Sequence, residues 1–137
     1  MKYVLDTNAV SALMKGDIAV LERLRRSNKE GVSIPQPVLA ELSYGIERLP
    51  RSKRRDRLQQ SLRSIRREIA RTTWTDDVSE HFGAIKAGLE KRGERVEDFD
   101  VAIGAHALAA GAVLVTTNAG HLSRIEDLEI EDWAAKG

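Results

Sequence analysis

The sequence contains no cysteine, which excludes disulfide bonds and metal sites built from thiolates. It also lacks any apolar run close to the roughly 20 residues that a transmembrane helix needs. An aspartate already stands at position 6, so the N-terminal residues are not expected to act as a signal peptide. No internal repeat, linker or low-complexity segment interrupts the 137 residues. We therefore expect a cytoplasmic protein that forms a single domain over residues 1–137.

The formal net charge is only +1, but the charges are distributed unevenly along the chain. Ten Lys or Arg and two acids lie between Arg48 and Arg71, whereas the segment from Glu126 to Asp132 holds five acids and no base. A basic segment can bind a phosphate backbone or an acidic protein, and it can equally be the solvated face of a helix. The charge pattern alone leaves these interpretations open.

Short apolar runs alternate with segments of helical periodicity. The apolar runs predict strands at residues 3–5, 32–34, 72–75, 112–115 and 128–130. The periodic segments predict helices at residues 9–15, 17–24, 37–49, 52–69, 78–92, 101–110 and 121–125. Because strands alternate with helices, we expect an α/β fold, a three-layer α/β/α sandwich with a central, mostly parallel sheet.

Acidic and amide side chains stand where predicted strands end or helices begin, at Asp6, Glu41, Asp98, Asp100 and Asn118. In a parallel sheet these positions meet at one edge, where ligands usually bind. Carboxylates brought together repel unless a cation joins them, and oxygen ligands without His or Cys suit Mg²⁺ or Mn²⁺. Such a site could activate water against a phosphodiester, although each acid by itself could also cap a helix.

Five stretches follow one another along the chain: residues 4–8, 37–45, 98–107, 115–122 and 128–133. They begin with Val-Leu-Asp-Thr-Asn and include Asp-Phe-Asp-Val-Ala-Ile-Gly-Ala-His-Ala and Val-Thr-Thr-Asn. In sequence and order they resemble the motifs of PIN-domain ribonucleases, and more narrowly those of the VapC toxins of bacterial toxin–antitoxin pairs. The resemblance spans nearly the whole chain. It implies a PIN-like fold and a metal-dependent endoribonuclease.

The resemblance also assigns roles to individual residues. Asp6 and Asp100 match the family's metal-binding aspartates, and Glu41 matches its acidic residue on the third helix. With Asn118 they are the implied catalytic residues, and Mg²⁺, or Mn²⁺, is the implied cofactor. Asn118 stands where the family often has Asp, which leaves one negative charge fewer for a second metal.

Further positions have supporting roles by the same resemblance. Asn8 and Thr116 match polar residues that support the site, and Asp98 is expected to be a helix cap or a second supporting carboxylate. His106 lies within an apolar helix, and we expect it to be a buried, hydrogen-bonded core residue.

The family likeness implies partners as well. These are a second copy of the chain in a homodimer, an RNA such as a tRNA or a ribosomal loop, and an antitoxin of the VapB type. The antitoxin tail is expected to lay an apolar helix against residues 10–24 and 38–49 and to reach the acidic pocket with a basic side chain. The segment from Arg48 to Arg71 is expected to contact RNA phosphates, with Arg54, Arg55 and Arg57 as the residues to test.

Two other functions fit parts of the pattern. A phosphatase of the haloacid dehalogenase type also has a strand running into an Asp, but it needs a second Asp where this chain has Asn8. Trapping of an aspartyl-phosphate would reveal it. A PIN-like module that binds RNA or a partner without cutting is the other alternative. The presence of Asp6, Glu41 and Asp100 together argues for catalysis, whereas metal binding without RNA cleavage would favour the silent module.

Overall fold

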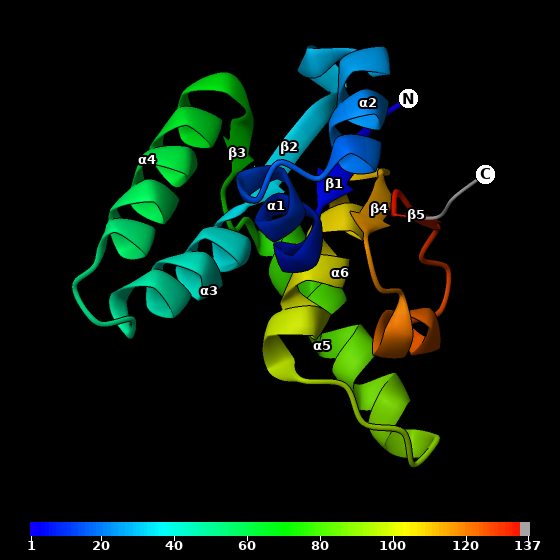
Figure 1. Ribbon diagram of the computed structural model, residues 1–137. Coiled ribbons are helices and arrows are strands. Elements are labelled where there is room, and N and C mark those ends of the chain that lie inside the picture. Colours follow the sequence, from blue (N-terminus) through cyan, green and yellow to red (C-terminus); the bar gives the residue numbers. More distant parts are fainter. Residues whose placement is uncertain (135–137) are drawn as a thin grey trace.

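The computed structural model describes residues 1–134, and they build one five-stranded sheet (Figure 1). The strands are β1 (Tyr3–Leu5), β2 (Val32–Pro35), β3 (Ala70–Thr72), β4 (Val113–Thr116) and β5 (Ile130–Asp132). They lie in the order β3-β2-β1-β4-β5, and every neighbouring pair is parallel. The predicted parallel α/β fold is confirmed, with β1 at the centre of the sheet.

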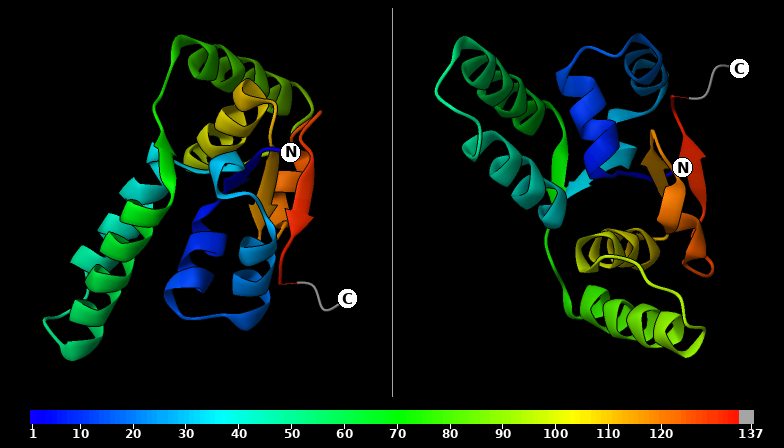
Figure 2. Two further views of the ribbon diagram at one scale, coloured as in Figure 1. Left: turned by 90° about the horizontal axis from the view of Figure 1, so that it is seen from above. Right: turned by 60° about the horizontal axis from the view of Figure 1, so that its bottom comes forward.

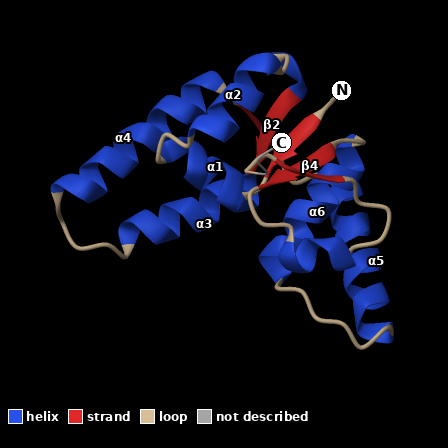
Figure 3. Cartoon of the chain, turned by 45° about the vertical axis from the view of Figure 1, so that its right-hand side comes forward, coloured by secondary structure: helices blue, strands red, loops and turns tan. Residues whose placement is uncertain are grey.

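Helices cover both faces of this sheet. They are α1 (Thr7–Met14), α2 (Ile18–Arg26), α3 (Gln36–Glu47), α4 (Lys53–Glu68), α5 (Asp76–Lys91) and α6 (Asp98–Ala110), with two short 3₁₀ helices, η1 (Lys29–Gly31) and η2 (Gly120–Arg124). One face carries α1, α2 and α4, and the other carries α6 with α5 packed behind it (Figure 2). The hairpin of α3 and α4 projects away from the sheet (Figure 3). No helix within residues 1–134 combines the length and the apolar character needed to cross a bilayer.

Two strands differ from their predicted positions. The third was predicted at residues 72–75 but ends at Thr72, because Thr75 caps α5 through the Val78 N–H and the Trp74 indole donates to Ser79 on the same helix. The last was predicted at residues 128–130 but begins at Ile130, which pairs with Leu114 of β4. The acidic residues of β5 made this strand hard to predict, because Glu and Asp are depleted in strands.

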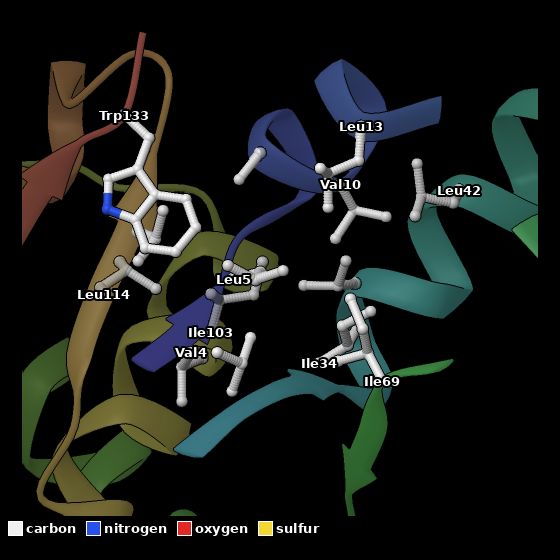
Figure 4. Packing of buried hydrophobic residues seen from close by; sticks show 14 of the residues in the cluster. Val4, Leu5, Val10, Leu13, Ile34, Leu42, Ile69, Ile103, Leu114 and Trp133 are labelled. Carbon is white, nitrogen blue, oxygen red and sulfur yellow. The ribbon is translucent and has the colours of Figure 1, made fainter. Parts of the chain in front are cut away.

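The core lies between the sheet and its helices. Val4 and Leu5 of β1, Ile34 of β2 and Leu114 of β4 are at most 1% exposed, and Ile103 of α6 packs with them (Figure 4). A strand whose successive residues are all buried is covered on both faces, which explains the short continuous apolar runs in the sequence. The carboxyl ends of β1 and β4 are thereby held in place beside each other.

Candidate active site

Asp6 directly follows the central strand β1, where the chain turns into α1. Its backbone N–H donates to the Val115 carbonyl of β4 at 2.9 Å, so the main chain of Asp6 is held by the neighbouring strand. Its carboxylate caps α1 by accepting the Ala9 N–H at 2.8 Å. The N-terminus of a helix favours a negative charge, and Asp6 is only 4% exposed. Local backbone geometry therefore explains why a carboxylate is buried here.

Burial makes the ionised form of Asp6 costly. It raises the pKa of Asp6 from 3.8 to about 6, although hydrogen bonds from the Thr116 hydroxyl and from the Ala9 and Asn8 amides lower the pKa. The charge of Asp100 raises it further. A group in this position gains free energy from a nearby cation, because the cation would offset both the desolvation and the repulsion.

Two more helices bring their own carboxylates to the same place. Asp100, in the first turn of α6, is partly buried, and burial raises its pKa. The charges of Glu41 and Glu97 raise the pKa of Asp100 further, whereas His121 lowers it. Glu41, in the second turn of α3, is thus electrostatically linked to Asp100, and Asp100 to Asp6. Three of the acids that the sequence predicted at one edge of the sheet are thus close enough in the fold for their charges to act on one another in turn, Glu41 on Asp100 and Asp100 on Asp6.

Glu41 is held by Thr7, a residue that the sequence analysis did not assign to the site. The Thr7 hydroxyl donates to Glu41 Oε1 at 2.6 Å. Thr7 is the first residue of α1, so the turn that buries Asp6 also directs this hydroxyl at α3. The sequence signal was present in the polar Asp-Thr-Asn run, but the partner of Thr7 lies 34 positions away.

Glu97 and His121 were also missed. Glu97 is the residue before α6, and His121 lies in η2, a short helix that contacts α6. Both act on the pKa of Asp100, with opposite signs. Glu97 could have been suspected from its place beside Asp98, but nothing in the sequence shows that η2 packs on α6.

The supporting residues are placed differently from one another. Thr116 is fully buried; its hydroxyl donates to the Asn118 carbonyl and accepts the Asn118 N–H, both at 3.0 Å. Its polar side chain beside Asp6 also lowers the pKa of Asp6. Asn8 is exposed and acts on Asp6 through its backbone N–H. Asn118 is exposed in the loop after β4.

Asp98 faces away from the cluster, because its carboxylate pairs with Lys86 of α5 at 3.0 Å. Residues two apart on a helix point to nearly opposite sides, so Asp98 and Asp100 cannot serve the same site.

His106 is a core residue as predicted. It is 2% exposed, its Nδ1 lies 3.2 Å from the Thr72 hydroxyl, and burial lowers its pKa.

The oxygen ligands fit a hard divalent cation. Among the described residues 1–134, no three His, Cys, Asp or Glu side chains converge closely enough to hold a metal ion by themselves. Mg²⁺ commonly takes only one or two carboxylates and completes its shell with water and substrate phosphate. Asp6 and Asp100 would supply such a pair, and a cation between them would lower the raised pKa of each.

Comparison with known proteins identifies the family of this chain. Residues 3–128 match the PIN domain family. Ribonuclease VapC2 of Haemophilus influenzae is 33% identical over 138 residues, which covers 97% of this chain and 98% of that protein. The tRNA(fMet)-specific endonuclease VapC of Shigella flexneri is 30% identical over 137 residues, covering 98% and 99%.

Solved structures give the same result. A chain of the DNA-bound VapBC from Salmonella typhimurium superposes with a TM-score of 0.86 at 29% identity, covering 97% of this chain and 98% of that one. A chain of VapBC2 from Rickettsia felis, bound to a DNA fragment from its promoter, gives a TM-score of 0.84 at 30% identity, covering 97% and 99%. The chain therefore belongs to the PIN-domain family and, within it, to the VapC ribonucleases.

Proposed function

We propose that this VapC-family ribonuclease hydrolyses RNA phosphodiester bonds at the carboxylate cluster, with Mg²⁺ or Mn²⁺ held by Asp6 and Asp100. The observation that carries the proposal is the buried Asp6, whose pKa is raised to about 6 beside the charge of Asp100. A bound divalent ion would lower the pKa of a water molecule and neutralise charge on the phosphate. Side chains of this chain would carry out the remaining proton transfer and positioning steps.

Glu41 is the residue that we assign as proton acceptor. Its Oε1 takes the Thr7 hydrogen bond, which leaves Oε2 to accept a proton from an attacking water. Thr7 fixes the orientation of the carboxylate before substrate arrives, which reduces the entropy lost in reaching the reactive geometry. We assign Asn118 to a water or a substrate oxygen, through its amide, and Asn8 and Thr116 to support of Asp6.

The partners follow from the relatives. The similar solved structures are VapBC complexes, and this supports a VapB-type antitoxin as the partner of this chain. An apolar hollow of about 450 Å³ between α2 and α4 would accept an apolar helix; its lining includes Leu13, Leu21, Leu24, Ile65 and Ile69. Leu13, Leu21 and Leu24 of this lining come from the two helices predicted within residues 10–24, but the opposite wall is α4 rather than residues 38–49.

The remaining assignments extend the same proposal. We propose that residues 1–137 act as one PIN domain in the cytoplasm, as a homodimer, and that the substrate is a structured RNA. One relative is named as specific for tRNA(fMet), which supports a tRNA or an rRNA loop as the class to test.

Cleavage of a tRNA pool and of rRNA by the purified protein tests the proposal. Wild type should cut with Mg²⁺ or Mn²⁺ and not with a chelator, and Asp6→Asn and Asp100→Asn should each abolish cutting. Asp98→Asn is the matched control, because it removes a carboxylate two residues from Asp100 that pairs with Lys86 instead. Cutting that survives in Asp6→Asn and Asp100→Asn would overturn the proposal.

Calorimetry with Mn²⁺ separates the alternatives if wild type cuts neither RNA. Metal binding that is lost in Asp6→Asn, without cleavage of any RNA, would identify a silent PIN-like module and overturn the catalytic assignment. A phosphoryl group trapped on Asp6 would instead identify a phosphatase.

A further inference from the structure

We propose that four arginines at the C-terminal end of α4 and on β3 form the surface that holds the RNA backbone. The proposal rests on RNA being the substrate, as proposed above. Arg63, Arg66, Arg67 and Arg71 line a single hollow of about 330 Å³. All four are exposed. The charge pattern of the sequence showed a basic segment, but it did not show which of its side chains converge.

The convergence has a simple geometric origin. Arg63, Arg66 and Arg67 are spaced by three and four residues, so they share one face of α4. Arg71 comes from β3, which is an edge strand of the sheet, and its guanidinium donates to the Arg66 carbonyl. Helix and strand together therefore place four positive groups around one hollow at the margin of the molecule.

These charges lack internal compensation. Within residues 1–134, none of the four arginines forms an ion pair. By contrast, Arg55 in the first turns of α4 pairs with Glu47 at 3.0 Å and also lies near the Leu49 carbonyl. Like charges that surround a hollow repel one another until an anion enters. Among the described residues, Lys53, Arg54 and Arg57 at the other end of α4 also form no ion pair, but they do not line this hollow. The distinguishing feature of the four arginines is therefore that they converge, and this proposal differs from the expectation that Arg54, Arg55 and Arg57 hold the RNA.

The lining of the hollow favours a phosphate backbone over a protein partner. In the part of the chain that the structure describes, neither an apolar side chain nor a carboxylate lines it. Protein partners normally need a buried apolar or aromatic anchor at the centre of the contact. Guanidinium groups instead bind phosphate oxygens through bidentate hydrogen bonds, and the RNA backbone carries one phosphate per nucleotide.

The surface also adjoins α3, the helix whose earlier turns carry Glu41. Arg63 and Arg66 line a second hollow, of about 150 Å³, together with Ser43 and Glu47 of α3, the helix that carries Glu41. Strand β3 lies two strands from β1, which is roughly 10 Å at the usual strand spacing, and α4 enters β3 at its amino end, whereas Asp6 follows the carboxyl end of β1. An RNA longer than a few nucleotides can span both separations, with one phosphate at the arginines and another at Asp6 and Asp100. The arginines bind substrate and do not take part in the chemistry.

The test compares two triple variants that lose the same charge from opposite ends of α4. Arg63→Gln/Arg66→Gln/Arg67→Gln removes three charges from the surface, and Lys53→Gln/Arg54→Gln/Arg57→Gln removes three from the other end. Binding of fluorescent tRNA is measured by anisotropy with chelator present, as a function of salt. Three lost phosphate contacts should reduce the slope of log K against log salt by about 2 and weaken binding on the order of 100-fold near 0.1 M salt.

The second triple variant should keep the wild-type slope. Equal losses in both variants would mean that only net charge matters, and an unchanged slope in the first variant would exclude the surface; either result overturns the proposal. If the first variant loses binding to polyglutamate but keeps binding to tRNA, the surface belongs to an acidic protein partner, and this result also overturns the proposal. Steady-state cleavage should show a raised KM and an unchanged kcat in the first variant. If wild type cuts no RNA, the proposed function fails, independently of the comparison between the variants.

Discussion

Replacing Asp6 by Asn should remove a pH-dependent loss of stability that the metal-free protein carries. The pKa of Asp6 is about 6 in the folded protein, against a usual value of 3.8, because the side chain is buried. Between these two pH values the folded state holds a proton that the unfolded state has released. Stability therefore falls as pH rises through this window, by roughly 3 kcal/mol in total.

Asn is a suitable replacement because it keeps the local structure. Its amide oxygen can accept the Ala9 N–H as Asp6 does, and Asn is as good a helix cap as Asp. The variant should thus match wild type below about pH 4 and exceed it by up to roughly 3 kcal/mol above about pH 7. The measured quantity is the free energy of unfolding in urea, with chelator, at several pH values.

Other carboxylates titrate in the same range, so the difference between variant and wild type is the quantity to follow. Asp17→Asn makes the same substitution at the exposed cap of α2 and controls for the exchange of Asp by Asn at a helix cap. Added Mg²⁺ at neutral pH should stabilise wild type and not Asp6→Asn, because binding to the folded state alone raises its stability. Parallel stability curves for wild type and Asp6→Asn would refute the reasoning from burial.

Two further predictions concern single contacts. Thr7→Val keeps the side-chain shape but cannot donate to Glu41, so kcat should fall about tenfold or more, with KM little changed and recovery in Thr7→Ser; cleavage assays that show no loss would remove Thr7 from the site. Gly104→Ala should destabilise the fold by about 1–3 kcal/mol, because its Cβ would lie 2.8 Å from Ile125 Cδ1. Gly83→Ala on α5 meets no atom within 4 Å and should instead stabilise by about 0.5–1 kcal/mol; urea unfolding that shows equal effects at the two glycines would contradict the packing argument.

Much of the fold could be read from local pattern. The apolar runs at residues 3–5, 32–34 and 112–115 are strands in the structure, and their alternation with helical periodicity predicted the parallel sheet. The family resemblance that the motifs carried is confirmed by the match of residues 3–128 to the PIN domain. The two displaced strands lie at the sheet edges and have different reasons: a helix cap over residues 74–79 displaces β3, whereas pairing with Leu114 decides where β5 begins.

The sequence by itself determined which side chains stand where strands end, since a polar residue after a buried strand must lie at the sheet edge. Asp6 was identified in this way, Glu41 and Asp100 were identified from their places in the first turns of predicted helices, and the family resemblance favoured Asp100 over Asp98. Only the tertiary structure decided how they are used. Thr7 holds Glu41, Asp98 turns to Lys86, and four arginines from α4 and β3 meet in one hollow. These relations depend on strand order and on the direction of each side chain around its helix, and residues distant along the chain set both.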